Sequence, residues 1–330
     1  MKFLIAGLGS IGRRHLRNLL ALGERDIILY RTHKSTLPDD ELAAYPAVSS
    51  LKAGLAQGAE AVIVSNPTAL HLEVAIPAAQ AGCHLLLEKP ISHSWEGVDE
   101  LAQAIQHGGG QVLVGFQFRF HPSIQKAVEL LQAGVIGKPL SARAHWGEYL
   151  PGFHPWEDYR TSYAARDDLG GGVIFTLCHP LDYLGWMFGE AEAVWAFAER
   201  LSGLELAVED TAEIAVRFRN GMLASVHLDY TQRPATHTFE VIGEQGSLHW
   251  ENASGRLSVF RARSEQNGWE HFLPPEGFER NELFLAEMRH FIDLTHGQVK
   301  SMCNISEGIR SLKWALAAHQ SAQEKRLVEL

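Results

Sequence analysis

Three glycines near the start of the chain constrain its fold more than any other feature. They stand in G-x-G-x-x-G spacing between a strand-like run at residues 3–6 and a segment in which leucines recur at helical spacing. In dinucleotide-binding folds the first glycine makes a tight turn, the second lets the backbone approach a pyrophosphate, and the third lets helix and strand pack closely. The pattern predicts a dinucleotide at the positive N-terminus of the helix, with an ordinary glycine turn as the alternative. The expected contacts are Gly7, Gly9, Ser10, Ile11 and Gly12.

Further strand-like runs continue the pattern, and most are separated by segments long enough for a helix. They lie at residues 26–30, 61–65, 84–88 and 111–116. Alternating strands and helices are typical of an α/β fold with a doubly wound parallel sheet. Because 330 residues are many for one hydrophobic core, we expect two domains. Residues 1–120 are predicted to form a dinucleotide-binding Rossmann domain, and residues 121–330 a second domain.

The end of the second strand-like run bears on the choice of cofactor. An enzyme specific for NAD usually carries Asp or Glu about 20 residues after the glycines, bound to the ribose 2′-hydroxyl. Here the sequence reads LYRTHKS, with Arg31 at this place and no carboxylate within the motif. Because a guanidinium binds phosphate through two parallel hydrogen bonds, Arg31 favours the 2′-phosphate of NADP(H). NAD(H) stays open, and the motif could also be a solvated charged loop.

A second glycine-led run, GGGVIFTLCHPLDYLGW at residues 170–186, contains a histidine directly before a proline. Because proline is favoured at the first helical position, we expect a helix that begins near Pro180 and ends at Gly189. His179 then lies at the positive end of this helix, which favours the neutral imidazole that can accept a proton. Asp182, one turn further on, could orient the ring. A core histidine bonded to a backbone carbonyl is the alternative.

Two short motifs complete the set. SNPTALH (65–71) and EKP (88–90) each follow a strand-like run, where ligands bind in such folds. The glycine-rich start, these two motifs and the run with His179 occur in the order typical of one family. The chain resembles the glucose–fructose oxidoreductase/inositol dehydrogenase/MocA (Gfo/Idh/MocA) family over nearly its whole length.

The resemblance implies a fold and an activity. It implies an N-terminal Rossmann domain and a C-terminal α/β domain with an open, mostly antiparallel sheet, through which a homodimer or homotetramer would assemble. The implied activity is NAD(P)-dependent hydride transfer to or from a secondary hydroxyl or ketone of a sugar, sugar acid, polyol or nucleotide sugar. Two alternatives stay open: a redox-neutral glycosidase that uses NAD transiently, and a non-catalytic dinucleotide-binding sensor.

The resemblance also assigns roles to residues. Lys89 matches the catalytic lysine of the family's EKP motif. The resemblance also implies that the Lys89–Pro90 peptide bond can be cis. His179 matches the family histidine and is our candidate general base, whereas Thr176 stands where many members carry an aspartate. The further expected cofactor contacts are Ser65, Asn66, Pro67, His71, Glu88 and Lys89.

Substrate contacts are expected on both sides of the predicted domain boundary. Aromatic residues crowd residues 145–163, and aromatic side chains suit the apolar faces of sugar rings. Arg160 could hold a carboxylate or phosphate of the substrate. A packed loop or a subunit contact is the alternative for this segment. The expected substrate contacts are Lys89, Gln117, Arg119, Trp156, Arg160, Thr176 and His179.

Composition argues against several other classes of protein. The net charge is −10 with no Lys/Arg cluster, which disfavours nucleic acid as a partner. No apolar run approaches the ~20 residues that span a bilayer, the chain does not start like a signal peptide, and three widely spaced cysteines fit a reducing cytoplasm. The seventeen histidines show no H-E-x-x-H or paired C-x-x-C spacing, so we predict no metal.

Overall fold

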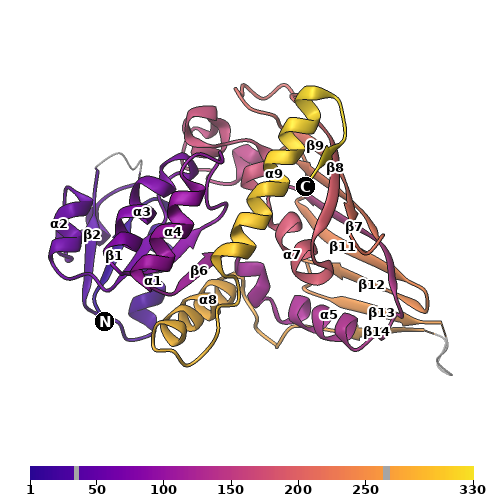
Figure 1. Cartoon of the computed structure of the whole chain (residues 1–330), viewed down its shortest axis with the longest axis horizontal. Helices are drawn as coiled ribbons and strands as arrows, with labels where there is room; N and C mark the ends of the chain where they lie inside the picture. The colour runs from indigo at the N-terminus through magenta and orange to yellow at the C-terminus, as the bar shows by residue number, and fades with distance from the viewer. Residues whose placement is uncertain (33–36, 263–267) are drawn as a thin grey trace. The chain divides into compact units, whose positions relative to one another are not determined.

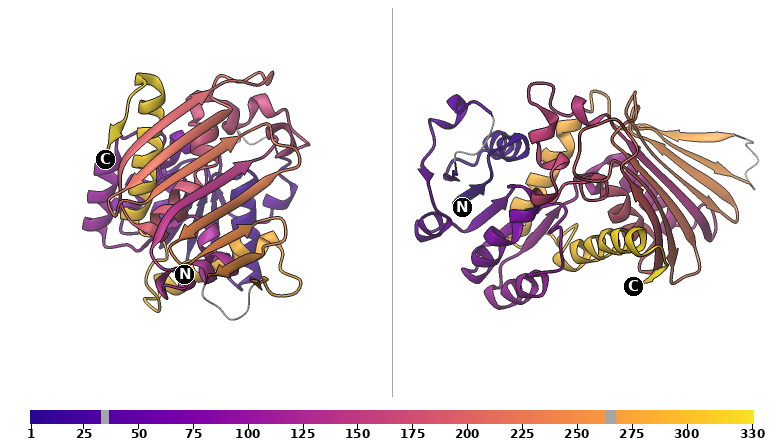
Figure 2. Two further views of the ribbon diagram at one scale, coloured as in Figure 1. Left: turned by 90° about the vertical axis from the view of Figure 1, so that its right-hand side faces the viewer. Right: turned by 90° about the horizontal axis from the view of Figure 1, so that it is seen from above.

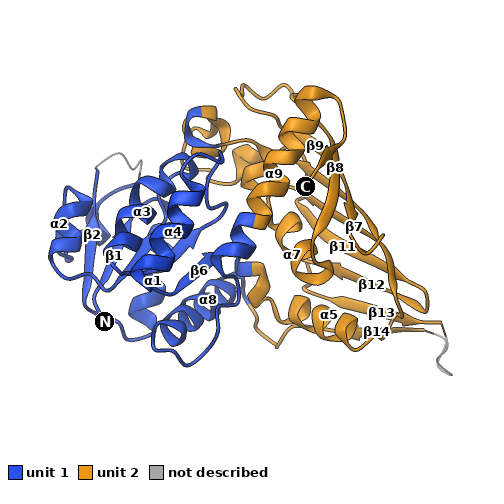
Figure 3. Ribbon diagram, in the orientation of Figure 1, with its two compact units in different colours: residues 1–117, 168–170, 279–309 blue, residues 118–167, 171–278, 310–330 orange. Residues whose placement is uncertain are grey.

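The computed structural model describes residues 1–32, 37–262 and 268–330, and the chain divides into two compact units (Figure 3). Unit 1 comprises residues 1–117, 168–170 and 279–309. Unit 2 comprises residues 118–167, 171–278 and 310–330. The sequence suggested a boundary near residue 120 and a second domain that includes everything after it. The structure divides the chain after Gln117 and returns residues 279–309 to unit 1.

Unit 1 contains a six-stranded parallel sheet in the order β3-β2-β1-β4-β5-β6 (Figure 1). Its strands are β1 (Phe3–Ala6), β2 (Ile27–Tyr30), β3 (Ala47–Val48), β4 (Ala61–Val64), β5 (His84–Glu88) and β6 (Val112–Gly115). Every residue of β1, β4 and β6 is buried, as expected for a parallel sheet covered on both faces. This is the doubly wound order of a Rossmann fold, and the predicted fold class of this part is confirmed.

The helices of unit 1 are α1 (Ser10–Ala21), α2 (Leu51–Ala56), α3 (His71–Gln80), α4 (Val98–Gly108) and α8 (Arg280–Thr295). Helix α8 explains why residues 279–309 belong here. Its Asn281 amide donates to Asn18 of α1 at 3.1 Å, and the Arg14 guanidinium of α1 lies 4.5 Å from the centre of the Phe284 ring. Sequence periodicity does not show on which neighbour a helix packs, so the sequence could not reveal this return.

Unit 2 contains a nine-stranded sheet in the order β14-β13-β12-β11-β7-β10-β9-β8-β15 (Figure 2). Its strands are β7 (Pro139–Gly147), β8 (Ala191–Glu199), β9 (Thr211–Phe218), β10 (Leu223–Asp229), β11 (Thr236–Gly243), β12 (Gly246–Glu251), β13 (Leu257–Arg261), β14 (Trp269–Phe272) and β15 (Val328–Glu329). Only β7 and β10 pair in parallel among these described strands, so the predicted mostly antiparallel sheet is confirmed.

One face of this sheet is covered by helices, and the other carries none of the described helices (Figure 2). The helices of unit 2 are α5 (Pro122–Gln132), α6 (Val173–Thr176), α7 (His179–Phe188) and most of α9 (Ile305–Glu324). The sequence follows this one-sided burial, because in β9 buried and exposed residues alternate along the strand. We call the helix-covered face the inner face and the opposite one the outer face.

Short 3-10 helices connect these elements at Asp40–Leu42, Thr68–Leu70, Gln117–Phe120, Leu150–Gly152, Tyr159–Thr161, Tyr163–Ala165 and Asp167–Leu169. The cysteines Cys83, Cys178 and Cys303 are buried and form no disulfide among the described residues. Within the described part of the chain, no helix combines the length and the apolar character that crossing a bilayer would require.

Candidate active site

The glycine loop of unit 1 has the geometry that a dinucleotide site needs. Gly7 has a φ of +92°, and a Cβ atom there would lie 2.3 Å from the backbone nitrogen of Asn66. A Cβ atom on Gly12 would lie 1.9 Å from the carbonyl oxygen of Gly7. At Gly9, by contrast, an added Cβ would meet nothing within 4 Å. Two glycines are therefore required by packing, and the middle one leaves open space where a pyrophosphate would approach.

Helix α1 begins directly behind this open position. Gly9 is its N-cap, Ser10 and Ile11 are its first residues, and no acidic side chain occupies its first turn. The amide groups of the first turn of a helix have no partner within the helix, and the helix dipole makes this end positive. The residues present therefore fit the diphosphate of a nicotinamide dinucleotide.

The loop after β4 is tied to its neighbours by the residues that we expected to contact the cofactor. The Ser65 hydroxyl lies 2.8 Å from the carbonyl oxygen of Gly7, and the Asn66 side-chain amide donates to the carbonyl of Leu70 at 2.6 Å. The ring nitrogens of His71 lie 2.8 Å and 2.9 Å from the carbonyl oxygens of Pro90 and Asn66. These side chains hold the loop, with Pro67 within it, against the glycine turn and the EKP motif.

Burial lowers the pKa of His71 to about 4, so its ring is neutral at physiological pH. A neutral imidazole donates from one nitrogen only, and both of its nitrogens face backbone carbonyls. His71 therefore acts on the shape of the loop rather than as an ionisable group.

The EKP motif lies at the carboxyl end of β5, and its Lys89–Pro90 peptide bond is cis. Glu88, which we expected at the cofactor, is buried and accepts a hydrogen bond from Nε2 of His15 at 2.7 Å. Glu287 of α8 completes a buried cluster with His15 and Glu88. One imidazole nitrogen of His15 and one carboxylate oxygen of each glutamate lie within 4.8 Å of one another. The carboxylate of Glu88 is therefore bonded within unit 1, and its expected contact with the cofactor stays a prediction.

The pKa values of the two carboxyl groups in this cluster are shifted in opposite directions. Burial acts to raise the pKa of Glu88, but the hydrogen bond and charge of His15, with Lys89, outweigh it and the pKa is lowered. Burial and the nearby charge of Glu88 raise the pKa of Glu287 well above its usual value. The pKa values of these two neighbouring carboxyl groups are thus shifted in opposite directions.

Arg31 lies directly after β2, and its environment differs from the expectation. Its guanidinium forms an ion pair with Asp39, which also lies 3.6 Å from Nη2 of Arg13. The LYRTHKS motif itself contains no carboxylate, but Asp39, four residues after the motif, lies beside the Arg31 guanidinium. His33, Lys34 and Ser35 of this motif lie outside the described residues.

In unit 2, His179 occupies the predicted place at the start of a helix. Helix α7 begins at His179 with Cys178 as its N-cap and ends before Gly189, which has a φ of +85°. The buried imidazole makes an edge contact with Phe118, with ring centres 5.0 Å apart, and lies 5.4 Å from the Trp146 ring. The helix prediction is confirmed, and the ring is held by aromatic packing that the sequence did not reveal.

This aromatic packing comes from the inner face of the sheet. Trp146 of β7 stacks on His237 of β11 with ring centres 4.4 Å apart and planes 5° from parallel. Phe118 contacts both rings and also Trp250 of β12. His237 lies opposite Trp146 in the strand pairing. Only the register of these strands brings the residues together, so sequence spacing could not identify them.

Asp182 and Arg119 form a buried ion pair, which revises two expectations. Arg119 donates from Nε and Nη2 to the two carboxylate oxygens of Asp182 at 3.0 Å and 2.7 Å, and its side chain is 0% exposed. The Ser311 hydroxyl donates to the same carboxylate at 3.3 Å. The ion pair and the burial give Arg119 a structural role in unit 2 and weaken the substrate contact that we expected of it. Asp182, expected to orient His179, has both oxygens bonded to Arg119.

The glycines before α6 serve packing within unit 2. A Cβ atom on Gly172 would lie 2.5 Å from Glu209, and one on Gly171 would lie 2.4 Å from the carbonyl oxygen of Tyr163. Protein atoms therefore fill the space next to both glycines. Thr176, at the end of α6, is buried next to the Tyr230 hydroxyl.

Two expected substrate contacts lie on an exposed segment. The Trp156 side chain is 63% exposed and packs only against the ring of His154 among the described aromatic contacts. Arg160 is bonded to two carboxylates, Asp158 at 2.9 Å and Glu205 at 2.6 Å. An acidic group on a substrate would have to compete with both, which weakens the role we expected for Arg160.

Two family descriptions match this chain. Residues 1–116 match the oxidoreductase family with an NAD-binding Rossmann fold, and residues 124–249 match the GFO/IDH/MocA C-terminal domain. The 1,5-anhydro-D-fructose reductase of Ensifer adhaerens is 30% identical over 275 residues, which cover 82% of this chain and 80% of that protein. The chain therefore belongs to the Gfo/Idh/MocA family of oxidoreductases, and the predicted resemblance is confirmed.

Two further proteins extend the comparison over the full length. The myo-inositol 2-dehydrogenase of Thermotoga maritima is 27% identical over 100% of this chain and 98% of that protein. The structure of a levoglucosan dehydrogenase in complex with NADH and levoglucosan superposes with a TM-score of 0.88. That match covers 99% of this chain and 98% of the other at 21% identity, so it concerns the fold alone.

Within unit 1 the structure brings the glycine loop, the loop after β4 and the EKP motif together at one edge of the sheet, where Gln117 is buried just beyond β6. Within unit 2 it places His179 on the inner face and leaves Trp156 and Arg160 on an exposed segment. The residues that the sequence did not identify are those that support the expected ones: His15, Glu287, Asp39, Phe118 and His237.

Proposed function

We propose that the protein is an NAD(P)-dependent dehydrogenase or reductase acting on a secondary hydroxyl or ketone of a sugar, sugar acid, polyol or nucleotide sugar. The observation that carries this proposal is the open position at Gly9, followed in the same unit by Lys89 at the carboxyl end of a parallel strand. The relatives at 30% and 27% identity are named for an anhydro-sugar and for inositol, which are both polyhydroxylated rings.

The nicotinamide, when bound, supplies the carbon that accepts or donates the hydride. The Lys89 ammonium donates a hydrogen bond to the reacting oxygen of the substrate and stabilises the negative charge that grows there during oxidation. His179 takes the hydroxyl proton and returns it in the reverse direction. Its position in the first turn of α7 favours the neutral ring that this step needs. Thr176 has no ionisable group and transfers no proton in this scheme.

For the cofactor we propose that Arg31 contacts the ribose 2′ position and that NADP(H) binds more tightly than NAD(H). The planar guanidinium at the end of β2 supports a phosphate contact. The ion pair with Asp39 opposes it, because the phosphate has to replace a carboxylate whose side chain is 52% exposed. Titration of both cofactors by fluorescence tests this proposal, and tighter NAD(H) binding would contradict it.

The substrate class is tested by a spectrophotometric screen of sugars, sugar acids, polyols and nucleotide sugars with NAD⁺ and NADP⁺. The expected result is reduction of the cofactor with at least one member of these classes. Product release without any net change in cofactor absorbance would instead identify a redox-neutral glycosidase. Cofactor binding without turnover of any substrate would support a dinucleotide-binding sensor.

We also propose that the chain assembles as a homodimer or homotetramer through the sheet of unit 2. The support is the family resemblance together with an outer sheet face that none of the described helices covers. Light scattering at micromolar concentration tests it, and a monomer would contradict it.

For the compartment we propose the cytoplasm. The three cysteines form no disulfide in the part of the chain that the structure describes, which supports a reducing environment.

A further inference from the structure

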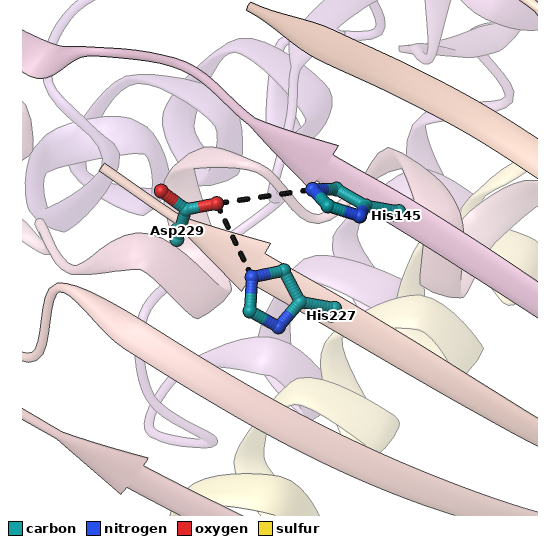
Figure 4. Close-up of side chains that lie close together, drawn as sticks. All are labelled: His145, His227 and Asp229. Carbon is teal, nitrogen blue, oxygen red and sulfur yellow. Dashed lines mark hydrogen bonds and ion pairs between the residues drawn. The ribbon is translucent and has the colours of Figure 1, made fainter. Parts of the chain in front are cut away.

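The outer face of the sheet in unit 2 carries a cluster of two histidines and an aspartate that the proposed function does not use. His145 lies on β7, and His227 and Asp229 lie two residues apart on β10. In the parallel pairing of these strands, His145 is opposite His227 and Gly147 is opposite Asp229. Because alternate residues of a strand point to the same face, all three side chains project from one side of the sheet (Figure 4).

The distances within this cluster fit the coordination sphere of a metal ion. Oδ2 of Asp229 lies 3.2 Å from Nε2 of His227 and 3.9 Å from Nε2 of His145 (Figure 4). All three ligand atoms lie within 4.8 Å of one another. Ligand atoms around a tetrahedral zinc ion lie about 3.3 Å apart, which follows from zinc–ligand bonds of about 2.0–2.1 Å. Small rotations of the side chains would therefore complete the geometry.

One ring nitrogen of His145, the one that faces the cluster, has no hydrogen-bond partner among the described residues, although the His145 side chain also interacts with Gln232. Nε2 of His145 is buried and makes no hydrogen bond within residues 1–32, 37–262 and 268–330. A buried polar atom without a hydrogen bond costs free energy, so such atoms in native proteins call for a partner. A metal ion held by Asp229 would supply that partner.

The aspartate is fixed in the orientation that a ligand requires. Its Oδ1 accepts hydrogen bonds from the backbone nitrogens of Thr231 at 2.7 Å and Gln232 at 2.6 Å, and from the Thr231 hydroxyl at 2.7 Å. These bonds leave Oδ2 directed at the two imidazoles. The neighbouring strand makes room for this oxygen, because a Cβ atom on Gly147 would lie 2.1 Å from Oδ2.

The second histidine is oriented by a carboxylate behind it. Nδ1 of His227 donates to Oε1 of Glu213 on β9 at 2.6 Å, which leaves Nε2 facing Asp229. Histidine ligands of metal ions usually donate their other ring N–H to a carboxylate in this way, which fixes the tautomer and raises the basicity of the ligating nitrogen. The cluster thus contains both the ligands and the outer partner of a metal site.

We propose that His145, His227 and Asp229 bind one divalent transition-metal ion, zinc by preference, and that Glu213 positions His227. Two imidazoles and one carboxylate suit zinc, whereas calcium and magnesium prefer oxygen ligands alone. Three protein ligands would leave a fourth position for water. A hollow of about 380 Å³ adjoins the two histidines, and Glu213 and His249 also help to line it. The site joins β7 to β10 on the outer face, whereas Trp146 and His179 lie on the inner face, so the ion ties two strands and takes no part in hydride transfer.

Sequence motifs could not reveal this site, and our prediction of no metal rested on such motifs. His145 and His227 are 82 residues apart, and only the parallel pairing of β7 with β10 makes them neighbours. The spacing of His227 and Asp229 is ordinary for a strand.

The test is a calorimetric titration of zinc chloride into the full-length protein after treatment with a chelator, at about pH 8 because protons compete with metal ions for imidazole. We expect one zinc ion per chain. His145→Ala should weaken binding by more than about 100-fold, and Glu213→Gln by about 10- to 100-fold, the usual cost of losing an outer partner. His145 is preferred to Asp229 for this test, because Asp229→Asn would also disturb the turn at Thr231 and Gln232.

The matched control is His249→Gln, which removes a histidine from the same hollow but lies outside the three ligands. It should leave zinc affinity unchanged. If His249→Gln weakens binding as much as His145→Ala does, zinc binds to surface histidines in general and the proposal is wrong. The absence of binding to the unaltered protein would overturn it as well.

A second measurement reports on the ligands directly and is independent of activity. Cobalt(II) bound in place of zinc should give the visible absorption of a tetrahedral site, and His145→Ala should abolish it. A spectrum typical of octahedral cobalt with mostly water ligands would contradict the assignment. Because neither experiment uses cofactor or substrate, failure here would leave the proposed dehydrogenase function untouched.

Discussion

The two units bury their sheets differently, and their polar side chains are distributed accordingly. The parallel sheet of unit 1 has buried strands throughout its centre, so its polar side chains gather where the strands end, at Ser65 and Glu88. The sheet of unit 2 has two unlike faces. His179 meets an aromatic inner face, and His145 with His227 stands on the outer one. A sheet buried on both sides thus offers one edge for chemistry, whereas a one-sided sheet offers two separate surfaces.

The units also differ in how they tolerate buried charge. In unit 1, Glu287 is fully buried beside Glu88, and burial raises its pKa, which favours the protonated form. In unit 2, Asp182 is bonded to the Arg119 guanidinium by two hydrogen bonds, which fix it near the start of α7. Four predictions test this contrast.

The largest effect is expected at the strand edge of unit 1. Lys89→Ala removes the ammonium group that we propose to hydrogen-bond the reacting oxygen of the substrate, so we expect kcat to fall by about 100- to 10,000-fold. Lys52→Ala, at an exposed lysine of α2, is the control and should keep normal kcat. Steady-state kinetics on a confirmed substrate measure both. A near-normal kcat of the Lys89→Ala enzyme would show that Lys89 takes no part in the reaction.

The buried pair of unit 2 should dominate its stability. Asp182→Asn leaves the Arg119 guanidinium buried without a counter-charge, which typically costs about 3–5 kcal/mol of unfolding free energy. The matched control is Asp158→Asn, which breaks an exposed ion pair with Arg160 and should change stability little. Denaturant titration compares the two variants. Equal, small losses would mean that the Arg119–Asp182 pair is not an anchor.

A pH-dependent effect is expected at Glu209 in unit 2. Burial raises its pKa from 4.5 to about 7, so between these values the folded state keeps a proton that the unfolded state has lost. The contribution of Glu209 to the free energy of unfolding is therefore largest below pH 4.5. It falls as the pH rises towards 7, by an amount on the order of 3 kcal/mol. Glu209→Gln can still accept the hydrogen bond from the Ile174 amide and should remove this decline. Denaturation midpoints across this pH window are the measurement, and an unchanged slope in the variant would refute the assignment.

The smallest effect is expected at the cofactor end of unit 1. Asp39→Asn removes the carboxylate that competes for Arg31, so the affinity for NADP(H) should rise relative to NAD(H). Because Asp39 is 52% exposed and ion pairs with solvent-exposed carboxylates are typically worth about 1 kcal/mol or less, the ratio should change by less than about tenfold. Fluorescence titrations of both cofactors measure it. Arg31→Ala is the counterpart and should lower the ratio; a rise there would show that Arg31 does not read the 2′ position.

How far the sequence could predict this molecule depends on whether the interacting groups are close together along the chain. The glycine loop, the helix that starts at His179 and both sheet types follow from local spacing and from the family resemblance. Residues 279–309 were assigned to the wrong part, because a helix pattern does not specify its neighbour.

The sequence predicted the main residues of the candidate site, but not the residues that bond to them and hold them in place. The expected roles of Arg119, Glu88 and Arg160 changed because each is bonded to a carboxylate or imidazole that lies elsewhere in the sequence. Sequence can show that an arginine is present, but not that an aspartate 63 residues away already holds it. The cluster of His145, His227 and Asp229 on the outer face was missed for the same reason, since only the strand register brings these residues together.

The central claim is that His179 transfers the proton while Thr176 does not, although both lie buried in unit 2 within three residues of each other. The direct test is kcat of His179→Ala against Thr176→Val on a confirmed substrate. We expect His179→Ala to lose about 100- to 10,000-fold. Thr176→Val removes at most a neutral hydrogen bond worth ~1 kcal/mol and should lose less than about tenfold. A valine variant without activity beside an alanine variant with near-normal turnover would contradict the account.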